Sequence, residues 1–479
     1  MSKSTYTDGF FNVSSEHGFL PIHEPLKRLP NSFIELQILI DQLPNIITIP
    51  NEIVVCISLI PDYSEIIKNE NDVFVLQALF RAYTFVTSAF TLEKAYQEFK
   101  QTGDYGKARR SLPSNISVPL VLVSEKLDVY PWLDYHYAYS LGNYIKKDKD
   151  GTFDWKNLNM ACSFTGSKDE IGFIMVHVYI NELSPKLVES VLEYNKNESY
   201  YKSNPDKIYW LKNCAETMET MNYRRREMWL ASRHEHYNDF RVFIMGIKGN
   251  DSIFGDGLVY ENCFDNQPQQ FRGQTGAQDN IIPMIDIFSG IMDYYPENQL
   301  TDYLLDLRSY RPKCIQHFLS DIRDYYKKHP IYYELLETDN AEGLIYLLKI
   351  VDEVYLFRNG HWQFVQKYIM SNVKYAFATG GTPITTWLIN QIEAVLEYER
   401  VLIQSIKRIL QLKIISTEVH QLFSKLESNY EHKMELLYSQ VNELKNIDYN
   451  IELVYQKNIE LKLEDSSLEK GSTLKDKQA

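Results

Sequence analysis

One histidine, His361, stands near the start of a run whose spacing is typical of an amphipathic helix. Phe364, Val365 and Tyr368 follow it and share one apolar helical face. A histidine at such a position is usually a capping or surface residue, although a neutral imidazole can also ligate a metal ion. The 11 histidines of the chain show neither zinc-protease spacing nor a two-histidine, one-carboxylate pattern. A haem needs only one protein ligand because the porphyrin supplies four nitrogens, so such a ligand would leave no spacing motif.

A second histidine and two glycine-bearing runs supply further candidates for a ligand pocket. His177 lies four residues after Phe173, so both side chains share one helix face and can meet the same ligand. The alternative is a partly buried histidine satisfied by a backbone carbonyl. Glycines in residues 271–286 and 378–383 let a backbone approach a ligand closely, although Gly-Gly pairs are mostly turns. The two runs read Phe-Arg-Gly-Gln-Thr-Gly-Ala-Gln-Asp-Asn-Ile-Ile-Pro-Met-Ile-Asp and Ala-Thr-Gly-Gly-Thr-Pro.

Two charged residues have both a functional and a structural interpretation. Arg241 precedes an apolar run, where an arginine is as often part of a structural ion pair as a clamp for a ligand. Asp306 lies near Arg308 and Arg311, which could hold it in a surface cluster of little energetic weight.

The elements that must position these residues are predicted to be helices. Apolar residues recur at helical spacing from Phe33 to about Gly106, where Pro44, Pro50 and Pro61 are expected to separate short helices. Strand-like alternation is scarce, so we predict an all-α fold. Further helices are expected at about 131–146, 170–197, 206–248, 281–295, 301–308, 311–328, 341–356 and 361–371.

Four segments follow from these patterns. We predict a small, mostly helical N-terminal domain at 1–125, a larger helical domain at 126–390, a helical extension at 391–460 and a disordered tail at 461–479. The extension lacks Gly and Pro and carries a heptad-like pattern. Its two interpretations are a coiled coil that forms a homodimer and a helix hairpin that packs on its own domain. The pattern consists of Leu412, Ile415, Val419, Leu422 and Leu426, then Met434, Leu437, Val441 and Leu444.

Bulk composition excludes several classes of protein. The net charge of -14 argues against a general nucleic-acid partner, because phosphate binding needs a basic surface. Five widely spaced cysteines without a C-x-x-C pair favour a reducing compartment. The polar start lacks the apolar core of a signal peptide, and no long apolar run predicts a membrane span. We therefore expect a cytoplasmic protein.

Residues 271–286, the segment from His361 to Ile369 and the loop 378–383 together resemble the haem-pocket framework of the indoleamine 2,3-dioxygenase family. The resemblance extends over about residues 10–390 and fits a bacterial-type member, with a C-terminal extension that has no counterpart in the animal enzymes. It implies a helical haem protein that opens the indole ring of tryptophan with O2 as co-substrate.

The resemblance assigns the cofactor side of the pocket. His361 corresponds to the proximal ligand of haem b, whose iron is ferrous in the active form. Arg358 corresponds to an arginine near a haem propionate, and Asp306 to an acidic residue that pairs with this arginine. Gly276 would bring the backbone close to the haem.

The resemblance also assigns the substrate side. Arg241 would bind the substrate carboxylate, Thr379 would lie near its amino group, and Phe173 would stack near the indole. His177 takes the place of a serine of the animal enzymes and is the catalytic candidate, because a neutral imidazole can accept a hydrogen bond from the indole N–H. The other substrate-binding positions implied are Tyr135, Ala138, Tyr139, His236, Tyr237, Thr275, Gly276 and Gly380.

Two departures leave the chemistry open. His236 replaces a phenylalanine and Tyr139 a smaller aliphatic residue, and both changes could shrink or polarise the indole cavity. The first hypothesis is a dioxygenase that converts the small-molecule partner L-tryptophan, or a related indoleamine, into N-formylkynurenine. The second is a haem-dependent monooxygenase or rearrangement enzyme acting on a tryptophan-like, substituted indole or aromatic amino acid. The third is a non-catalytic helical interaction protein.

Overall fold

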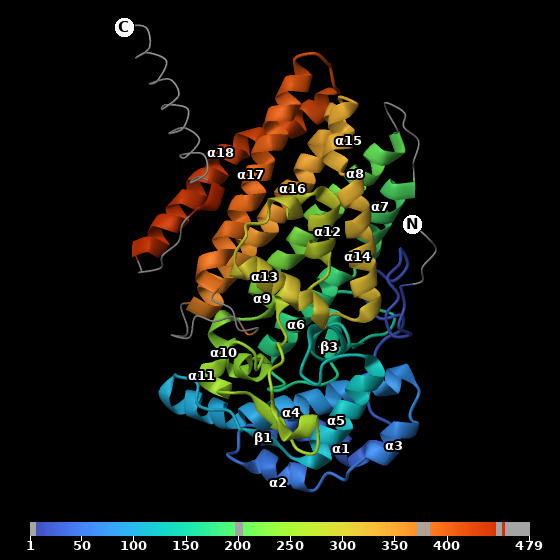
Figure 1. The fold of residues 1–479 in the computed structure, drawn as a ribbon, viewed down its shortest axis with the longest axis vertical. Helices are drawn as coiled ribbons and strands as arrows, with labels where there is room; N and C mark the ends of the chain where they lie inside the picture. Colours follow the sequence, from blue (N-terminus) through green and yellow to red (C-terminus); the bar gives the residue numbers. More distant parts are fainter. Residues whose placement is uncertain (1–5, 197–204, 371–378, 380–383, 447–452, 456–479) are drawn as a thin grey trace, which may run out of the picture.

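The structure is a computed structural model that describes residues 6–196, 205–370, 379, 384–446 and 453–455. Helices dominate these residues, and the strands among them are two or three residues long, so the predicted all-α class is confirmed. Figure 1 shows a layer of N-terminal helices below a taller bundle of long helices. All five cysteines are free.

The lower layer is built around one long buried helix, α4. The side chain of Asp72 caps it by accepting hydrogen bonds from the backbone N–H groups of Phe74 and Val75. Its length and composition would suffice to cross a membrane, but 89% of its most apolar window is buried by the rest of the fold. Pro44 lies inside the first helix instead of ending it. The helices of this layer are α1 (Ile34–Ile46), α2 (Glu52–Ser58), α3 (Ser64–Asn69), α4 (Val73–Thr102) and α5 (Ser114–Leu127).

Short strands lie between the helices and replace part of a predicted helix. β1 (Ser111–Leu112) pairs in parallel with β4 (Leu258–Tyr260), which pairs antiparallel with β5 (Pro268–Gln269). The prediction of a helix at 131–146 is wrong: a single π-helical segment, Tyr135–Tyr139, is capped by Asp134 and leads into β2 (Tyr144–Lys146), which pairs antiparallel with β3 (Leu158–Met160).

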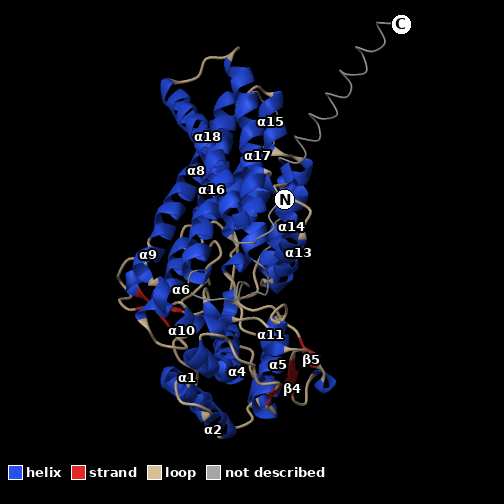
Figure 2. Cartoon of the chain, turned by 90° about the vertical axis from the view of Figure 1, so that its left-hand side faces the viewer, coloured by secondary structure: helices blue, strands red, loops and turns tan. Residues whose placement is uncertain are grey.

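The upper bundle surrounds α16 (Ala341–Phe364), which packs against α8, α12, α15, α17 and α18. Figure 2 shows the long helices α8, α16, α17 and α18 running side by side. The bundle and the elements that join it to the lower layer include α6 (Lys168–Asn181), α7 (Ser184–Lys196), α8 (Pro205–Arg226), α9 (Met228–Ala231), α10 (Asn238–Arg241), α11 (Asp251–Phe254), α12 (Ile281–Ser289), α13 (Gln299–Asp306), α14 (Lys313–Lys328), α15 (Ile331–Glu337), α17 (Ile384–Leu410) and α18 (Thr417–Asn446).

The predicted break between helices 341–356 and 361–371 is wrong. α16 runs without interruption through Gly360 to Phe364 and continues as a π-helical segment, Val365–Met370. The guanidinium of Arg225 lies directly beside Gly360: a Cβ at 360 would lie 2.0 Å from Nη1 of Arg225. His361 consequently belongs to the last turn of α16, not to the start of a helix.

The predicted extension forms a hairpin of α17 and α18. Residues 411–416 are not helical, and Leu412 and Ile414 in this loop are exposed, so the heptad pattern does not run through it. The apolar side of α18, which includes Val419, Leu437 and Val441, is buried, and α18 packs against α16 and α17 of the same chain. This is the arrangement of the hairpin interpretation. The predicted tail 461–479 lies outside the described residues.

Candidate active site

Side chains from three parts of the chain meet near the C-terminal end of α16. Phe173 and His177 project from one face of α6 with ring centroids 5.6 Å apart. The ring of Tyr237, just before α10, lies 5.0 Å from Phe173, and Tyr368 lies 6.3 Å from it. The structure therefore brings together Phe173, His177 and Tyr237, which were predicted as pocket residues. It adds Tyr368, which lies 195 positions after Phe173 in the sequence and was not predicted.

The side chain of His361 is accessible to solvent and is nevertheless closely surrounded by protein atoms. Its side chain is solvent-accessible, whereas its neighbours Gly360 and Trp362 are buried. Protein atoms nevertheless surround it closely enough that burial, with the positive charge of Arg225 and the neighbouring His177, lowers its pKa to about 4. His361 is thus recessed, accessible and neutral at physiological pH, which is the state in which an imidazole donates a lone pair.

His177 faces the same region from α6. Burial lowers its pKa, while the negative charge of Asp279 acts in the opposite direction. Gly276 approaches this ring: a Cβ at 276 would lie 3.4 Å from Cε1 of His177, at the edge of ordinary contact. The exposed Gly276 therefore leaves room beside the imidazole that a larger residue would take.

A set of buried and partly buried polar side chains lies next to His177, and we call it the Asp279 network. The hydroxyl of Tyr135 donates to Oδ2 of Asp279 over 3.1 Å, and Nδ2 of Asn181 donates to the same oxygen over 2.8 Å. Nδ2 of Asn181 also donates to the backbone carbonyl of His177 over 3.0 Å. The network consists of Tyr135, His136, Asn181, Asp279, Asn280 and Arg311.

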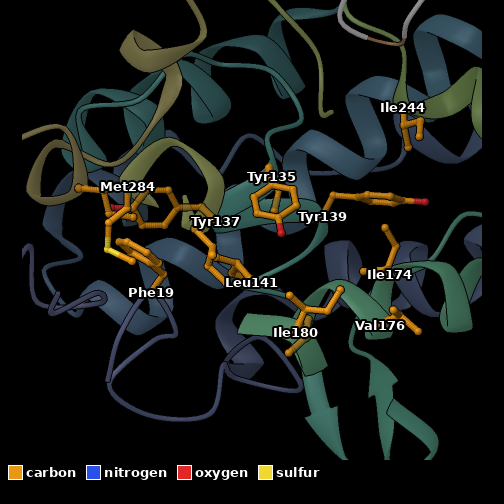
Figure 3. Close-up of a cluster of buried hydrophobic side chains, with 14 of the residues drawn as sticks. Phe19, Tyr135, Tyr137, Tyr139, Leu141, Ile174, Val176, Ile180, Ile244 and Met284 are labelled. Carbon is orange, nitrogen blue, oxygen red and sulfur yellow. The ribbon is translucent and has the colours of Figure 1, made fainter. Parts of the chain in front are cut away.

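The segment Tyr135–Tyr139 is fully buried, and its alternate residues turn to different sides. Figure 3 shows Tyr137 and Tyr139 pointing away from each other. Tyr139 packs among core aromatic rings, and its hydroxyl donates to Glu170 over 3.3 Å. Ala138 is also fully buried. Of the three predicted pocket residues in this segment, Tyr135 is the one whose ring contacts His177, at 5.8 Å between centroids.

Arg241 and His236 differ in their surroundings. Arg241 is fully buried, and its Nη1 donates to the hydroxyl of Tyr105 over 3.1 Å, close to Tyr237. His236 is half-buried and lies 3.1 Å from Asp239, so it turns toward a carboxylate instead of joining the aromatic cluster around Phe173.

The two glycine-bearing runs are joined through Thr379. Its hydroxyl donates to the carbonyl of Gln274 over 2.9 Å, and its carbonyl accepts from the backbone N–H of Gly246 over 2.8 Å. Thr275 caps the short turn that contains Gly276. Gly380 lies outside the described residues.

The predicted pairing of Arg358 with Asp306 is wrong. Arg358 pairs with Asp286 at 2.7 Å and donates to the carbonyl of Gln391 at 2.9 Å, all inside the bundle. Packing of α12 against α16 brings Asp286 to this position, whereas Asp306 ends α13 at a more open edge. Asp306 pairs there with Lys248 at 3.0 Å and Arg272 at 2.8 Å, so the alternative of a cluster with Arg308 and Arg311 is also wrong.

The family model for indoleamine 2,3-dioxygenase matches residues 8–395, well over half of the chain. The chain belongs to the indoleamine 2,3-dioxygenase family. It is 28% identical to indoleamine 2,3-dioxygenase 1 of Rattus norvegicus over 220 residues, which are 45% of this chain and about half (52%) of that relative. It is 24% identical to indoleamine 2,3-dioxygenase 2 of Homo sapiens over 378 residues, 75% of this chain and 83% of the relative. It is 26% identical to the 6-hydroxytryptophan 2,3-dioxygenase of Fusarium equiseti over 373 residues, which are 75% of this chain and 84% of that relative.

The indoleamine 2,3-dioxygenase family is haem-dependent, and the residues around His361 suit a haem. His361 offers a neutral, accessible imidazole at the end of a rigidly packed helix. Phe364 and Tyr368, which follow His361 by three and seven residues, contact each other, and Tyr368 also contacts Phe173, so an aromatic surface adjoins this end of the helix. Among the described residues no three His, Cys, Asp or Glu side chains gather to hold a metal ion, so iron at His361 would take its other ligands from the porphyrin.

Several residues of the candidate site were not predicted from the sequence. Asp279 and Asp286 both stand in the run 271–286, and their position there was the one available signal. Asn181 gave no signal beyond its place one helical turn after His177.

Proposed function

We propose that the chain is a haem-dependent dioxygenase that cleaves the indole C2–C3 bond of L-tryptophan or a related indoleamine. With L-tryptophan, both atoms of O2 would enter the product, N-formylkynurenine, and no other reactant is consumed. The observation that carries the proposal is a neutral, accessible His361 close to His177, whose ring lies 5.6 Å from that of Phe173, in a chain of this family. The relative from Fusarium equiseti is a 6-hydroxytryptophan 2,3-dioxygenase, which supports an indole amino acid as the substrate class.

Haem held by His361 would supply the iron that binds and activates O2. The protein's own contribution is mainly orientation of the substrate. Phe173 and Tyr237 would flank the indole, and neutral His177 would accept a hydrogen bond from its N–H. Arg241 would pair with the carboxylate and Thr379 would lie near the amino group, as the family resemblance implies.

The test is an absorption spectrum of the haem-supplemented protein, followed by turnover of L-tryptophan under 18O2. We expect a Soret band that responds to CO and to tryptophan, and a product that carries two labelled oxygens. His361→Ala should lose both the band and turnover while its circular dichroism stays that of a folded protein. A matched control is His432→Ala, because His432 lies on α18 and is exposed.

Each other result excludes the proposal in a different way. One labelled oxygen, or none, would support the monooxygenase or rearrangement alternative. A folded wild-type protein without a Soret band would support the non-catalytic alternative. Unaltered pigment and turnover in His361→Ala would remove His361 as the ligand.

A further inference from the structure

Both carboxylate oxygens of Asp279 are engaged, which fixes the side chain in one orientation. Oδ1 accepts a hydrogen bond from the backbone N–H of Ile281 over 2.9 Å, at the start of α12. Oδ2 accepts from the hydroxyl of Tyr135 over 3.1 Å and from Nδ2 of Asn181 over 2.8 Å. A carboxylate held by three donors from three segments keeps its charge at a defined place.

Asp279 reaches His177 through these same partners. Asn181 lies one turn after His177 on α6, and its amide nitrogen donates both to Asp279 and to the carbonyl of His177. The ring of Tyr135 meets His177 edge-on, with an interplanar angle of 79°. Tyr135 and Asn181 therefore join the carboxylate to the backbone and to the ring of the same histidine.

Titratable and charged groups reach His177 from several elements. Asp279 approaches from the run 271–286, Tyr135 from the π-helical segment and His361 from α16. Arg311 binds the backbone carbonyl of Asp279 over 2.9 Å and the side chain of Asn280 over 3.0 Å, and leaves the carboxylate to Tyr135 and Asn181. The nearby negative charge thus favours positive charge on the imidazole of His177.

We propose that Asp279 is a positioning residue for indole cleavage: through Tyr135 and Asn181 it holds His177 and strengthens this imidazole as the acceptor for the indole N–H. The inference rests on the proposed function. A stronger acceptor draws the N–H proton toward itself, and the nitrogen lone pair becomes more available to the C2–C3 bond that reacts with oxygen. The proton stays within this hydrogen bond, so no further reactant is required.

The first experiment compares L-tryptophan with 1-methyl-L-tryptophan, which has no indole N–H. Asp279→Asn keeps the size of the side chain and removes its charge. We expect kcat for L-tryptophan to fall roughly tenfold, because about 1.4 kcal/mol of assistance is lost, and kcat for the methylated substrate to change less than twofold. His177→Ala should show the same selectivity, and adding Asp279→Asn to it should cause no further loss.

A second, milder variant guards against misfolding of Asp279→Asn, and a second readout does not depend on enzyme activity. Tyr135→Phe removes one hydrogen bond and retains the charge, so we expect a two- to threefold loss on L-tryptophan alone. In the haem-free protein, NMR titration of the His177 ring should move to lower pH in Asp279→Asn by roughly half a unit or more.

Equal losses on both substrates, additive losses in the double variant or an unmoved His177 titration would overturn the role of Asp279. These results differ from failure of the proposed function, in which the wild-type protein itself would not turn over L-tryptophan.

Discussion

Two buried polar clusters in this molecule differ in their chemistry and in their place. The Asp279 network lies beside the candidate site, within residues 8–395, and joins one carboxylate and one guanidinium to four neutral side chains by hydrogen bonds. The second, which we call the Lys433 cluster, joins α16, α17 and α18 and consists almost entirely of charges. Its members are Lys349, Asp352, Glu353, Glu399 and Lys433.

The Lys433 cluster attaches a part of the chain beyond the family match to the helix that carries His361. Lys433 on α18 lies 2.8 Å from Glu399 on α17 and also pairs with Asp352 on α16. Ion pairs this deep give little net stability compared with apolar packing, but removal of one partner leaves a buried charge unpaired. The contrast suggests a division of roles, with the Asp279 network acting on catalysis and the Lys433 cluster on stability.

The largest expected effect is a loss of stability in a variant that disrupts the Lys433 cluster. Lys433→Ala leaves Asp352 and Glu399 buried together without their cation, and burial already raises the pKa of Glu399 to about 7. We expect the free energy of unfolding to fall by about 3–5 kcal/mol in denaturant titrations, with KM for L-tryptophan unchanged. Lys68→Ala is the control, because the exposed pair of Lys68 with Glu65 should contribute less than about 1 kcal/mol. A loss as small as that of the control, or a large change in KM, would contradict the division of roles.

The next effect belongs to the substrate side of the site. Arg241→Ala should raise KM for L-tryptophan roughly 50-fold, since a charged hydrogen-bonded partner of the carboxylate is worth about 2–3 kcal/mol, and should leave the haem spectrum intact. Arg233→Ala is a matched control, because Arg233 lies nearby in the chain but pairs with Asp169 at the surface. Unchanged kinetics would remove Arg241 from the pocket.

The smallest effect tests the Asp279 network through pH. His136 is fully buried, and burial together with the charge of Arg311 lowers its pKa to about 3. The unfolded chain takes up a proton on this residue near pH 6.5 and the folded chain does not, so stability must decline as the pH falls from about 6.5 toward 3. Between pH 7 and 5 the wild-type protein should lose about 2 kcal/mol more than His136→Gln.

Denaturant titrations at the two pH values measure this difference. His432→Gln, at an exposed position, should leave the pH dependence of the wild-type protein unchanged. An identical pH dependence in His136→Gln and the wild-type protein would show that His136 is not held neutral by the fold.

Much of the fold could be predicted from apolar periodicity, because most helices bury one face of a regular pattern. The errors occur where the ends of a helix are determined by capping residues or by contacts with residues distant in the sequence. No Gly or Pro marks the break at 411–416, where Nζ of Lys413 binds the carbonyl of Asp339 and Ser416 caps the start of α18. In the site, the family resemblance pointed to Phe173, His177 and Tyr237, which lie together, but also to His236, which turns toward Asp239 instead. The Arg358–Asp286 pair was missed because its two residues are 72 positions apart and meet only when their helices pack together.

Gly360 has no Cβ atom, and this affects the chemistry of the neighbouring candidate iron ligand, His361. The absence of a side chain at Gly360 is what admits the Arg225 guanidinium to that spot, and this cation opposes protonation of the adjoining imidazole. The identity of residue 360 therefore helps to set how easily the His361 nitrogen binds a metal ion. Any larger residue at 360 would displace the Arg225 guanidinium, and a proton would then compete more strongly for the His361 nitrogen.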